Sequence, residues 1–386
     1  MEFKLTETQE MVKNLAKEIA ENAITDDLIE EIENEHHVPD ELYKTICEAG
    51  ILGISLPEEL GGIDAGHVAM CLAIEEIAKK SASVASTLLV GLTFMETIKN
   101  YGTQEQKDMY LADGLAGKYR GAFAFTEPGT GSDPKQIQTI AHQDGDYFVL
   151  NGVKRFITNA GYEGPIIIWA KEEGTDKDIT AFIIDKFCEG YSLSSRWDLV
   201  CMSGSPVYDI FLDNVRVHKS RIIGERGQGF EILKGTVAHS KTLICATYVG
   251  TMAASYEAAV KYAKEKMHRN VSIGKFQAIQ LKIAQIAARL EACRLLTYRL
   301  AEETDDRSDM AHIVGWVGMV KAFVSDESVE VNTLAMNVLG PYGLAKEYKV
   351  ERYLRDSLLA PHVEGVSDMQ RVMAGSHILF SDDLLI

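Results

Sequence analysis

The hydrophobic period changes twice along the chain, and this change limits the fold more than any other sequence feature. Apolar residues recur with helical spacing up to about residue 114 and again after about residue 230. Between these stretches lie short runs of β-branched and aromatic residues separated by turn residues, which is typical of strands. We therefore expect an α+β fold with an N-terminal helical domain (1–117), a middle antiparallel β domain (118–228) and a C-terminal domain like a four-helix bundle (229–386).

Local signals place some of these elements. Thr6 and Gln9 form a capping box, which predicts that a helix begins at this point. Asn151-Gly152 separates two strand-like runs, Tyr147–Leu150 and Val153–Thr158. Because Asn-Gly is a strong signal for a two-residue hairpin turn, we expect these runs to pair as a hairpin.

The charge of the chain excludes several classes of partner. Its 39 basic and 57 acidic residues give a formal net charge of −18, and such a surface repels the phosphates of nucleic acids and anionic lipids. The N-terminus lacks a basic segment followed by an apolar stretch, and no uncharged apolar run is long enough to cross a bilayer. We therefore expect a cytoplasmic protein without nucleic-acid binding or membrane insertion.

The six cysteines predict neither disulfides nor a metal site. They are scattered, with no Cys-x-x-Cys pair and no Cys/His spacing that closes on zinc. Free, buried thiols in a reducing compartment explain this pattern. We therefore expect no bound metal.

Two segments carry groups suited to a ligand. Thr126–Asp133 (TEPGTGSD) combines hydroxyls with two glycines that let backbone N–H groups approach a ligand closely, but it has neither the P-loop nor the dinucleotide-binding pattern. Phe156–Gly161 (FITNAG) brings an aromatic ring and a hydroxyl to the end of a strand. From its residues alone, each segment fits a structural turn as well as the wall of a ligand site.

Near the C-terminus a single carboxylate, Glu364, lies between apolar residues and a glycine. Apolar surroundings raise the pKa of a carboxyl group and make it a suitable general base near neutral pH. A glutamate at the start of a helix, where its charge favours the helix dipole, explains the same spacing. The residues leave both interpretations open.

Seven motifs occur in an order and spacing that resemble the acyl-CoA dehydrogenase family, and they span essentially the whole chain. They are TEPGTGSD (Thr126–Asp133), FITNAG (Phe156–Gly161), GSP (Gly204–Pro206) with FLDNVRV (Phe211–Val217), GERGQGF (Gly224–Phe230), FQAIQLKIA (Phe276–Ala284), EYKVERYLRD (Glu347–Asp356) and VEGVSDMQR (Val363–Arg371). The resemblance implies the same order of helical, β and helical domains, an FAD cofactor and a homotetramer.

The resemblance also implies roles for individual residues. Glu364 matches the catalytic base, which removes the α-proton of an acyl-CoA while the β-hydrogen leaves as hydride to flavin N5. The positions that match FAD contacts are Phe125, Thr126, Gly131, Ser132, Phe156, Thr158, Lys266, Phe276, Asn337, Gly340 and Val366. The positions that match substrate contacts are Ser132, Lys241, Val363 and Gly365.

Departures from the family pattern make the chain resemble a divergent member. Lys266 stands where an arginine usually reaches the FAD pyrophosphate of a neighbouring subunit, so the charge is kept and the bidentate fork is lost. Val363 stands where a tyrosine usually precedes the base, which predicts a wider pocket. Val84–Phe94 lacks the arginine that tends to accompany dicarboxylic acyl groups, and an unpaired carboxylate is costly to bury. We therefore expect an uncharged acyl group, branched and cyclic groups included.

Several functions are compatible with this resemblance. The leading prediction is FAD-dependent α,β-dehydrogenation of an acyl-CoA to the 2-enoyl-CoA, with electrons passed to an electron-transfer flavoprotein. The same site run in reverse gives an enoyl-CoA reductase. Flavin monooxygenases and nitroalkane oxidases are related alternatives, although the monooxygenases generally lack the base that Glu364 matches. The altered flavin positions also allow a non-catalytic member that binds acyl-CoA or stabilises a complex.

Overall fold

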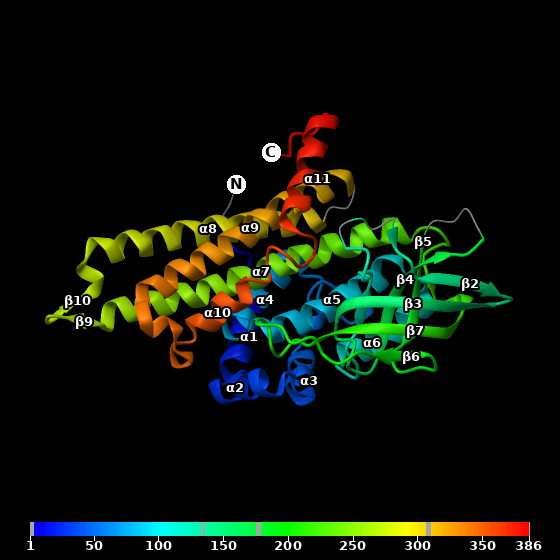
Figure 1. Cartoon of the computed structure of the whole chain (residues 1–386), viewed down its shortest axis with the longest axis horizontal. Helices are drawn as coiled ribbons and strands as arrows, with labels where there is room; N and C mark the ends of the chain where they lie inside the picture. The colour runs from blue at the N-terminus through cyan, green and yellow to red at the C-terminus, as the bar shows by residue number, and fades with distance from the viewer. Residues whose placement is uncertain (1–3, 132, 134–135, 175–178, 306–309, 386) are drawn as a thin grey trace.

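The chain runs through helices, then a β-sheet, then helices again (Figure 1). The computed structural model describes residues 4–131, 133, 136–174, 179–305 and 310–385. One apolar core contains buried side chains from all three parts. This arrangement confirms the expected α+β class, while the limits of the three domains stay predictions.

The N-terminal part is helical. Its elements are α1 (Glu7–Ala23), α2 (Asp26–Glu35), α3 (Asp40–Glu48), the 3-10 turns η1 (Ile51–Gly53) and η2 (Glu58–Leu60), α4 (Gly66–Lys80), α5 (Ala82–Tyr101) and α6 (Gln104–Leu115). The predicted capping box begins α1, because Gln9 N donates to Thr6 Oγ1 (3.2 Å) and Thr6 N donates to Gln9 Oε1 (3.0 Å). Most side chains of α4 and α5 are buried, so these two helices form the centre of this part.

The middle part is a twisted sheet whose strand pairs are mainly antiparallel, as expected. Its strands are β1 (Ala122–Ala124), β2 (Ile140–Asp144), β3 (Tyr147–Thr158), β4 (Pro165–Glu172), β5 (Ile179–Asp185), β6 (Tyr191–Leu193), β7 (Val207–His218) and β8 (Ile222–Ile223), with the turn η4 (Lys219–Arg221) before β8. The order is β6-β7-β3-β2-β4-β5-β8, and β1 pairs with β4. Only β1–β4 and β2–β4 are parallel among the described pairs.

The predicted hairpin at Asn151-Gly152 is wrong, because β3 continues through these residues as one strand. Pairing with β7 persists on both sides, and the register shifts between Leu150 and Gly152 because β7 has one residue more than β3 over this stretch. A Cβ at Gly152 would lie 2.5 Å from Thr139 Oγ1, so the glycine permits a close approach of the two segments. The hairpin turn lies earlier, at Gly145, which has a φ of +61° between β2 and β3. The Asn-Gly signal reports local turn propensity, which strand pairing overrides here.

The C-terminal part is a bundle built around one long helix. Its elements are α7 (Gly229–Glu265), the hairpin β9 (Met267–His268) and β10 (Val271–Ser272), η5 (Ile273–Lys275), α8 (Gln277–Asp305), α9 (Met310–Leu339), η6 (Gly340–Leu344), η7 (Lys346–Tyr348), α10 (Val350–Ser357) and α11 (Ser367–Phe380). Helix α7 packs against α4 and α5 as well as against α8 and α9. It therefore joins the N-terminal helices to the bundle.

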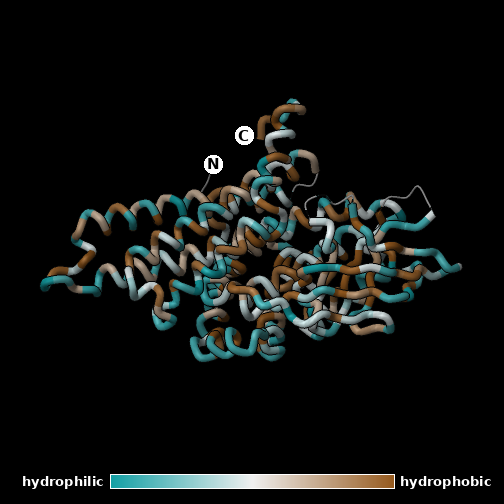
Figure 2. Tube along the Cα trace, viewed as in Figure 1, coloured by the Kyte–Doolittle hydropathy of each residue, from teal (hydrophilic) through white to brown (hydrophobic). Residues whose placement is uncertain are grey.

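The distribution of polarity agrees with this arrangement. Figure 2 shows hydrophilic residues along the outward helices α2 and α3 and hydrophobic residues along much of the sheet. Within the described residues, no helix combines the length and the apolar character needed to cross a membrane. The six cysteines are free thiols in the described chain, and all except Cys188 are buried.

A buried ion pair fixes the segment that follows β1. The amine of Lys154 in β3 is fully buried and donates to Glu127 Oε1 (2.7 Å) and to Trp169 O (2.7 Å). The same carboxylate oxygen accepts from Thr139 Oγ1 (2.6 Å). The start of Thr126–Asp133 is thus tied to the middle of the sheet.

We expect Lys154→Met to lower the free energy of unfolding by about 3–5 kcal/mol, because it leaves a buried carboxylate without its cation. Lys219→Met is a matched control, since Lys219 forms an exposed pair with Asp146, and its unfolding midpoint should stay nearly unchanged. Guanidinium unfolding of both variants measures the difference. Equal unfolding midpoints for the two variants would show that the buried ion pair contributes no more to stability than the exposed pair.

Candidate active site

The turn between α10 and α11 holds the predicted base, Glu364, in an uncommon backbone conformation. Glu364 has a φ of +53° and Gly365 a φ of +88°, so two successive residues lie in the left-handed region. The fully buried amine of Lys321 in α9 donates to Ala360 O (2.9 Å) and Gly365 O (2.7 Å). One buried cation therefore fixes both ends of the turn that carries Glu364.

The carboxylate of Glu364 points toward α7. Its Oε2 accepts a hydrogen bond from Ser240 Oγ at 2.6 Å. Burial raises the pKa of Glu364, and the hydrogen bond from Ser240 and the charges of Lys241 and Lys321 only partly oppose this effect. The carboxyl group is oriented and holds a proton closer to neutral pH than a free glutamate does, as general acid–base chemistry requires.

Lys241 follows Ser240 on α7 and lacks a partner of its own. Its side chain is 7% exposed, and within the described chain its ammonium group makes no hydrogen bond and no ion pair within 4 Å. Burial lowers the pKa of Lys241, while the charge of Glu364 opposes this shift. Because an unsatisfied buried amine is costly, a ligand group with a lone pair or negative charge would complete this site.

The β domain presents a second set of predicted residues near the ends of β1 and β3. Arg155 N donates to Thr126 O (2.8 Å), which draws the segment after β1 alongside β3. Thr126 and Thr158 are half-buried, and their hydroxyls make no hydrogen bond to any described residue. Phe156 has a φ of +58°, and its ring is 49% exposed beside Trp197, with 5.0 Å between the ring centroids. Unpaired hydroxyls and an open aromatic ring thus occur together at this end of β3.

The remaining predicted residues of the first segment differ in exposure. Phe125 is half-buried, and its ring packs edge-on against Trp169, with 6.4 Å between centroids. At Gly131 no described atom lies within 4 Å of the position that a Cβ would take. Ser132 lies outside the described residues.

A third set of predicted residues lies at the opposite end of α7. Lys266 Nζ lies 4.3 Å from the ring centroid of Tyr342, Phe276 is 41% exposed, and Asn337 is exposed. Gly340 has a φ of +61° and open space where a Cβ would be. The 26 residues from Ser240 to Lys266 correspond to about 39 Å of helix. Figure 1 shows the same separation, with β9 and β10 at the far end from the sheet. Within one chain, this third set of residues therefore lies far from Glu364.

Two valines flank the base, and two residues near it were not predicted. Val363 is half-buried against the core, and Val366 is 39% exposed immediately before α11. Ser240 and Lys321 hold Glu364 and its turn, yet they are 124 and 43 positions away from it in the sequence (364 − 240 and 364 − 321). Helical periodicity marks both only as positions on buried helices.

Comparison with known sequence families gives matches along almost the whole chain. The matching descriptions are "Acyl-CoA dehydrogenase, N-terminal domain" over residues 6–118, "middle domain" over 122–215 and "C-terminal domain" over 227–379. The chain belongs to the acyl-CoA dehydrogenase family. These are FAD-binding oxidoreductases that act on the CH–CH bond of acyl-CoA.

Individual members of the acyl-CoA dehydrogenase family resemble the chain over their full length. The 3-(aryl)acrylate reductase of Clostridium sporogenes is 37% identical, over 97% of this chain and 99% of that protein. The caffeyl-CoA reductase-Etf complex subunit CarC of Acetobacterium woodii is 34% identical, over 97% and 99%. The structure of butyryl-CoA dehydrogenase from Megasphaera elsdenii superposes with a TM-score of 0.93 at 30% identity, over 98% and 100%.

The residues present fit the FAD of the acyl-CoA dehydrogenase family. The free hydroxyls of Thr126 and Thr158 match the hydrogen-bonding needs of a flavin ring, and the open ring of Phe156 supplies an apolar face. The space at Gly131 leaves room for close backbone approach.

We expect Ser240→Ala to lower kcat/KM for acyl-CoA oxidation at neutral pH about 10-fold, or ~1.4 kcal/mol. Loss of this hydrogen bond raises the pKa of Glu364 further, so the rise of activity with pH moves to higher pH. Ser328→Ala is a matched control, because among the described residues Ser328 Oγ donates only to Ser325 O, within α9. The dependence of kcat/KM on pH in the two variants measures the effect. If the rise of activity at low pH does not shift in Ser240→Ala, the prediction is wrong.

Proposed function

We propose that this enzyme transfers a proton and a hydride across the Cα–Cβ bond of an acyl-CoA thioester, interconverting it with the 2-enoyl-CoA, and that Glu364 is the acid–base group. The observation that carries the proposal is the position of the Glu364 carboxyl group. The carboxyl group accepts a hydrogen bond from Ser240 and has a raised pKa, and Glu364 lies on a turn held by Lys321. A protein that only binds acyl-CoA does not need a carboxyl group with this combination of features.

The residues of the chain supply the proton chemistry. In oxidation Glu364 takes the α-proton, and in reduction it returns a proton to the α-carbon. The charges of Lys241 and Lys321 stabilise the carboxylate of Glu364, and the unpaired amine of Lys241 would also stabilise the negative charge that develops on the substrate as the α-proton leaves. FAD, when bound, takes up or gives back the β-hydrogen as hydride and thus balances the two electrons.

We propose that in the cell the reaction runs as reduction of a 2-enoyl-CoA. Two similar proteins are named as reductases, and one of them is a subunit of a reductase-Etf complex. Electrons then reach the flavin from an electron-transfer flavoprotein. Reduction needs a protonated Glu364 that can donate its proton, and the raised pKa of this group is compatible with that role. The location in the cytoplasm stays a prediction.

For the acyl group we propose an uncharged, cyclic substituent. Within the described residues, the segment of α5 from Val84 to Phe94 offers only small and apolar side chains and no cation. Val363 leaves more room beside the base than a tyrosine. The aryl and caffeyl groups in the names of the two reductases are uncharged and planar, which agrees with such a pocket.

The test is anaerobic absorbance of the FAD-loaded enzyme. Arylpropionyl-CoA should bleach the oxidised flavin band, and the matching arylacryloyl-CoA should reoxidise the reduced enzyme. Glu364→Gln should keep FAD and still bind acyl-CoA, but lose at least about 100-fold in the rate of bleaching, since general acid–base groups contribute about 10²–10⁴-fold. Bleaching by glutaryl-CoA at an equal rate would refute the uncharged acyl group, and rapid bleaching in Glu364→Gln would refute the role of Glu364.

We further propose that each FAD contacts two subunits of a homotetramer. Lys266, Phe276, Asn337 and Gly340 lie too far from Glu364 to serve the same flavin, so they would bind the FAD of a neighbour. The amine of Lys266 would then pair with its pyrophosphate, and Tyr342 holds the side chain in place.

Lys266→Ala should weaken FAD retention about 10-fold, because it removes a cation from a phosphate contact. Lys264→Ala removes an equally charged, exposed residue from the last turn of α7, just before Lys266, and should retain FAD normally. To test both variants, FAD release on dilution is monitored by flavin fluorescence, and the mass of the assembly is measured in parallel. Normal retention in Lys266→Ala tetramers would contradict the shared site.

A further inference from the structure

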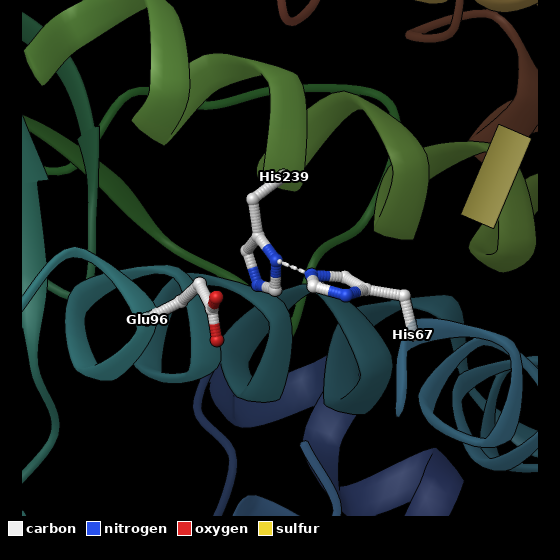
Figure 3. Close-up of side chains that lie close together, drawn as sticks. All are labelled: His67, Glu96 and His239. Carbon is white, nitrogen blue, oxygen red and sulfur yellow. Dashed lines mark hydrogen bonds between the residues drawn. The ribbon is translucent and has the colours of Figure 1, made fainter. Parts of the chain in front are cut away.

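Three buried side chains from three different helices meet beside α7, and none of them bonds Glu364 among the described residues. They are His67 of α4, Glu96 of α5 and His239 of α7, and one ligand atom of each lies within 4.8 Å of the others. Figure 3 shows the two imidazole rings and the carboxylate turned toward a common space. The exposed fractions of the three residues are 3%, 4% and 1%. These three residues are spread over 172 positions of the sequence, so their spacing does not predict a metal site.

His67 is oriented by a carboxylate on its far side. Its Nδ1 contacts Asp305 Oδ1, and its backbone N donates to Asp305 Oδ2 (3.0 Å). Gly66 allows this approach, because a Cβ there would lie 2.8 Å from Asp305 Oδ2. A proton held on Nδ1 by Asp305 leaves the lone pair on Nε2, which faces His239 Nδ1 at 2.8 Å. Metal-binding histidines typically have such a carboxylate partner.

Glu96 is oriented with one oxygen left available. Its Oε1 accepts from Lys99 Nζ (2.7 Å) and from Asn100 Nδ2 (2.8 Å). Among the described residues, its Oε2 accepts only a long hydrogen bond from Ser55 Oγ, at 3.4 Å. The carboxylate is thus fixed by two donors on one side and presents the other side to the cluster.

The local charge favours a cation. Asp305 and Glu96 carry two negative charges, Lys99 carries one positive charge, and neutral imidazoles leave a net charge of about −1. Two imidazole nitrogens and one carboxylate oxygen form the donor set of a zinc-type ion, and a fourth position stays open for water. Ligands at about 2.0–2.1 Å in a tetrahedral site lie about 3.3–3.4 Å apart. The imidazoles must therefore separate by only about 0.5 Å, while the carboxylate moves inward.

We propose that His67, Glu96 and His239 bind one divalent transition-metal ion of the zinc type, with Asp305 orienting His67 from outside. The ion ties α4 and α5 to α7 one residue before Ser240, and it takes no part in the transfer of hydride or proton at Glu364. With water in its fourth position, the ion would fix the position of α7.

The test uses the FAD-loaded protein, stripped with EDTA and titrated with Zn²⁺ and with Co²⁺. We expect one ion per chain, a higher melting temperature with Zn²⁺, and the long-wavelength absorption of tetrahedral Co²⁺. Glu96→Gln and His239→Gln should weaken binding at least 10-fold, and Asp305→Asn about 10- to 100-fold. FAD content and circular dichroism check that each variant folds.

A second cluster serves as the matched control. His312 Nδ1 and His377 Nε2 both contact Asp383 Oδ2, at 2.6 and 2.7 Å, in a less buried place. His377→Ala should leave Zn²⁺ binding unchanged. Anomalous diffraction of wild-type crystals at the zinc edge locates the ion without any variant. Absence of binding, loss of binding in His377→Ala, or zinc located at Asp383 would each overturn the proposal.

Discussion

The contact of α7 with helices on both sides of it sets the geometry of the whole molecule. This helix packs against α4 and α5 on the N-terminal side and against α8 and α9 in the bundle. It also carries Ser240, which bonds Glu364, and reaches Lys266 at its far end. Since a helix is stiff over this length, a shift or rotation of α7 would displace all of these groups together.

Buried lysines give the irregular segments near the site their fixed shape. Lys154 donates to Phe125 O (3.3 Å), just after β1, Lys186 to Arg120 O (2.7 Å) and Asn159 O (2.8 Å), and Lys321 to Ala360 O and Gly365 O. Burial lowers the pKa of these amines, to about 8 for Lys154 and Lys321 and about 7 for Lys186. An amine donates several hydrogen bonds at once, so one side chain can tie together carbonyl groups that no regular strand or helix satisfies.

The order of the elements could be predicted from the sequence because periodicity and capping are local properties. The capping box at Thr6 and the helical, strand and helical thirds follow from neighbours a few residues apart. The prediction failed at Asn151-Gly152, where pairing with β7 overrides a turn signal. The partners of Glu364 could not be predicted, because Ser240 approaches it only after α7 and the last turn have packed. The resemblance pointed to Glu364 itself, while its environment comes from tertiary contacts.

The distance along α7 between Ser240 and Lys266 has a genetic consequence under the proposed shared cofactor site. A substitution at the far end of the helix would damage the active site of another subunit and spare the one in its own chain. In a cell that makes two versions of the protein, the defect would therefore spread to normal subunits in mixed assemblies. Conversely, two subunits with different lesions, one at each end of α7, could together form an intact site.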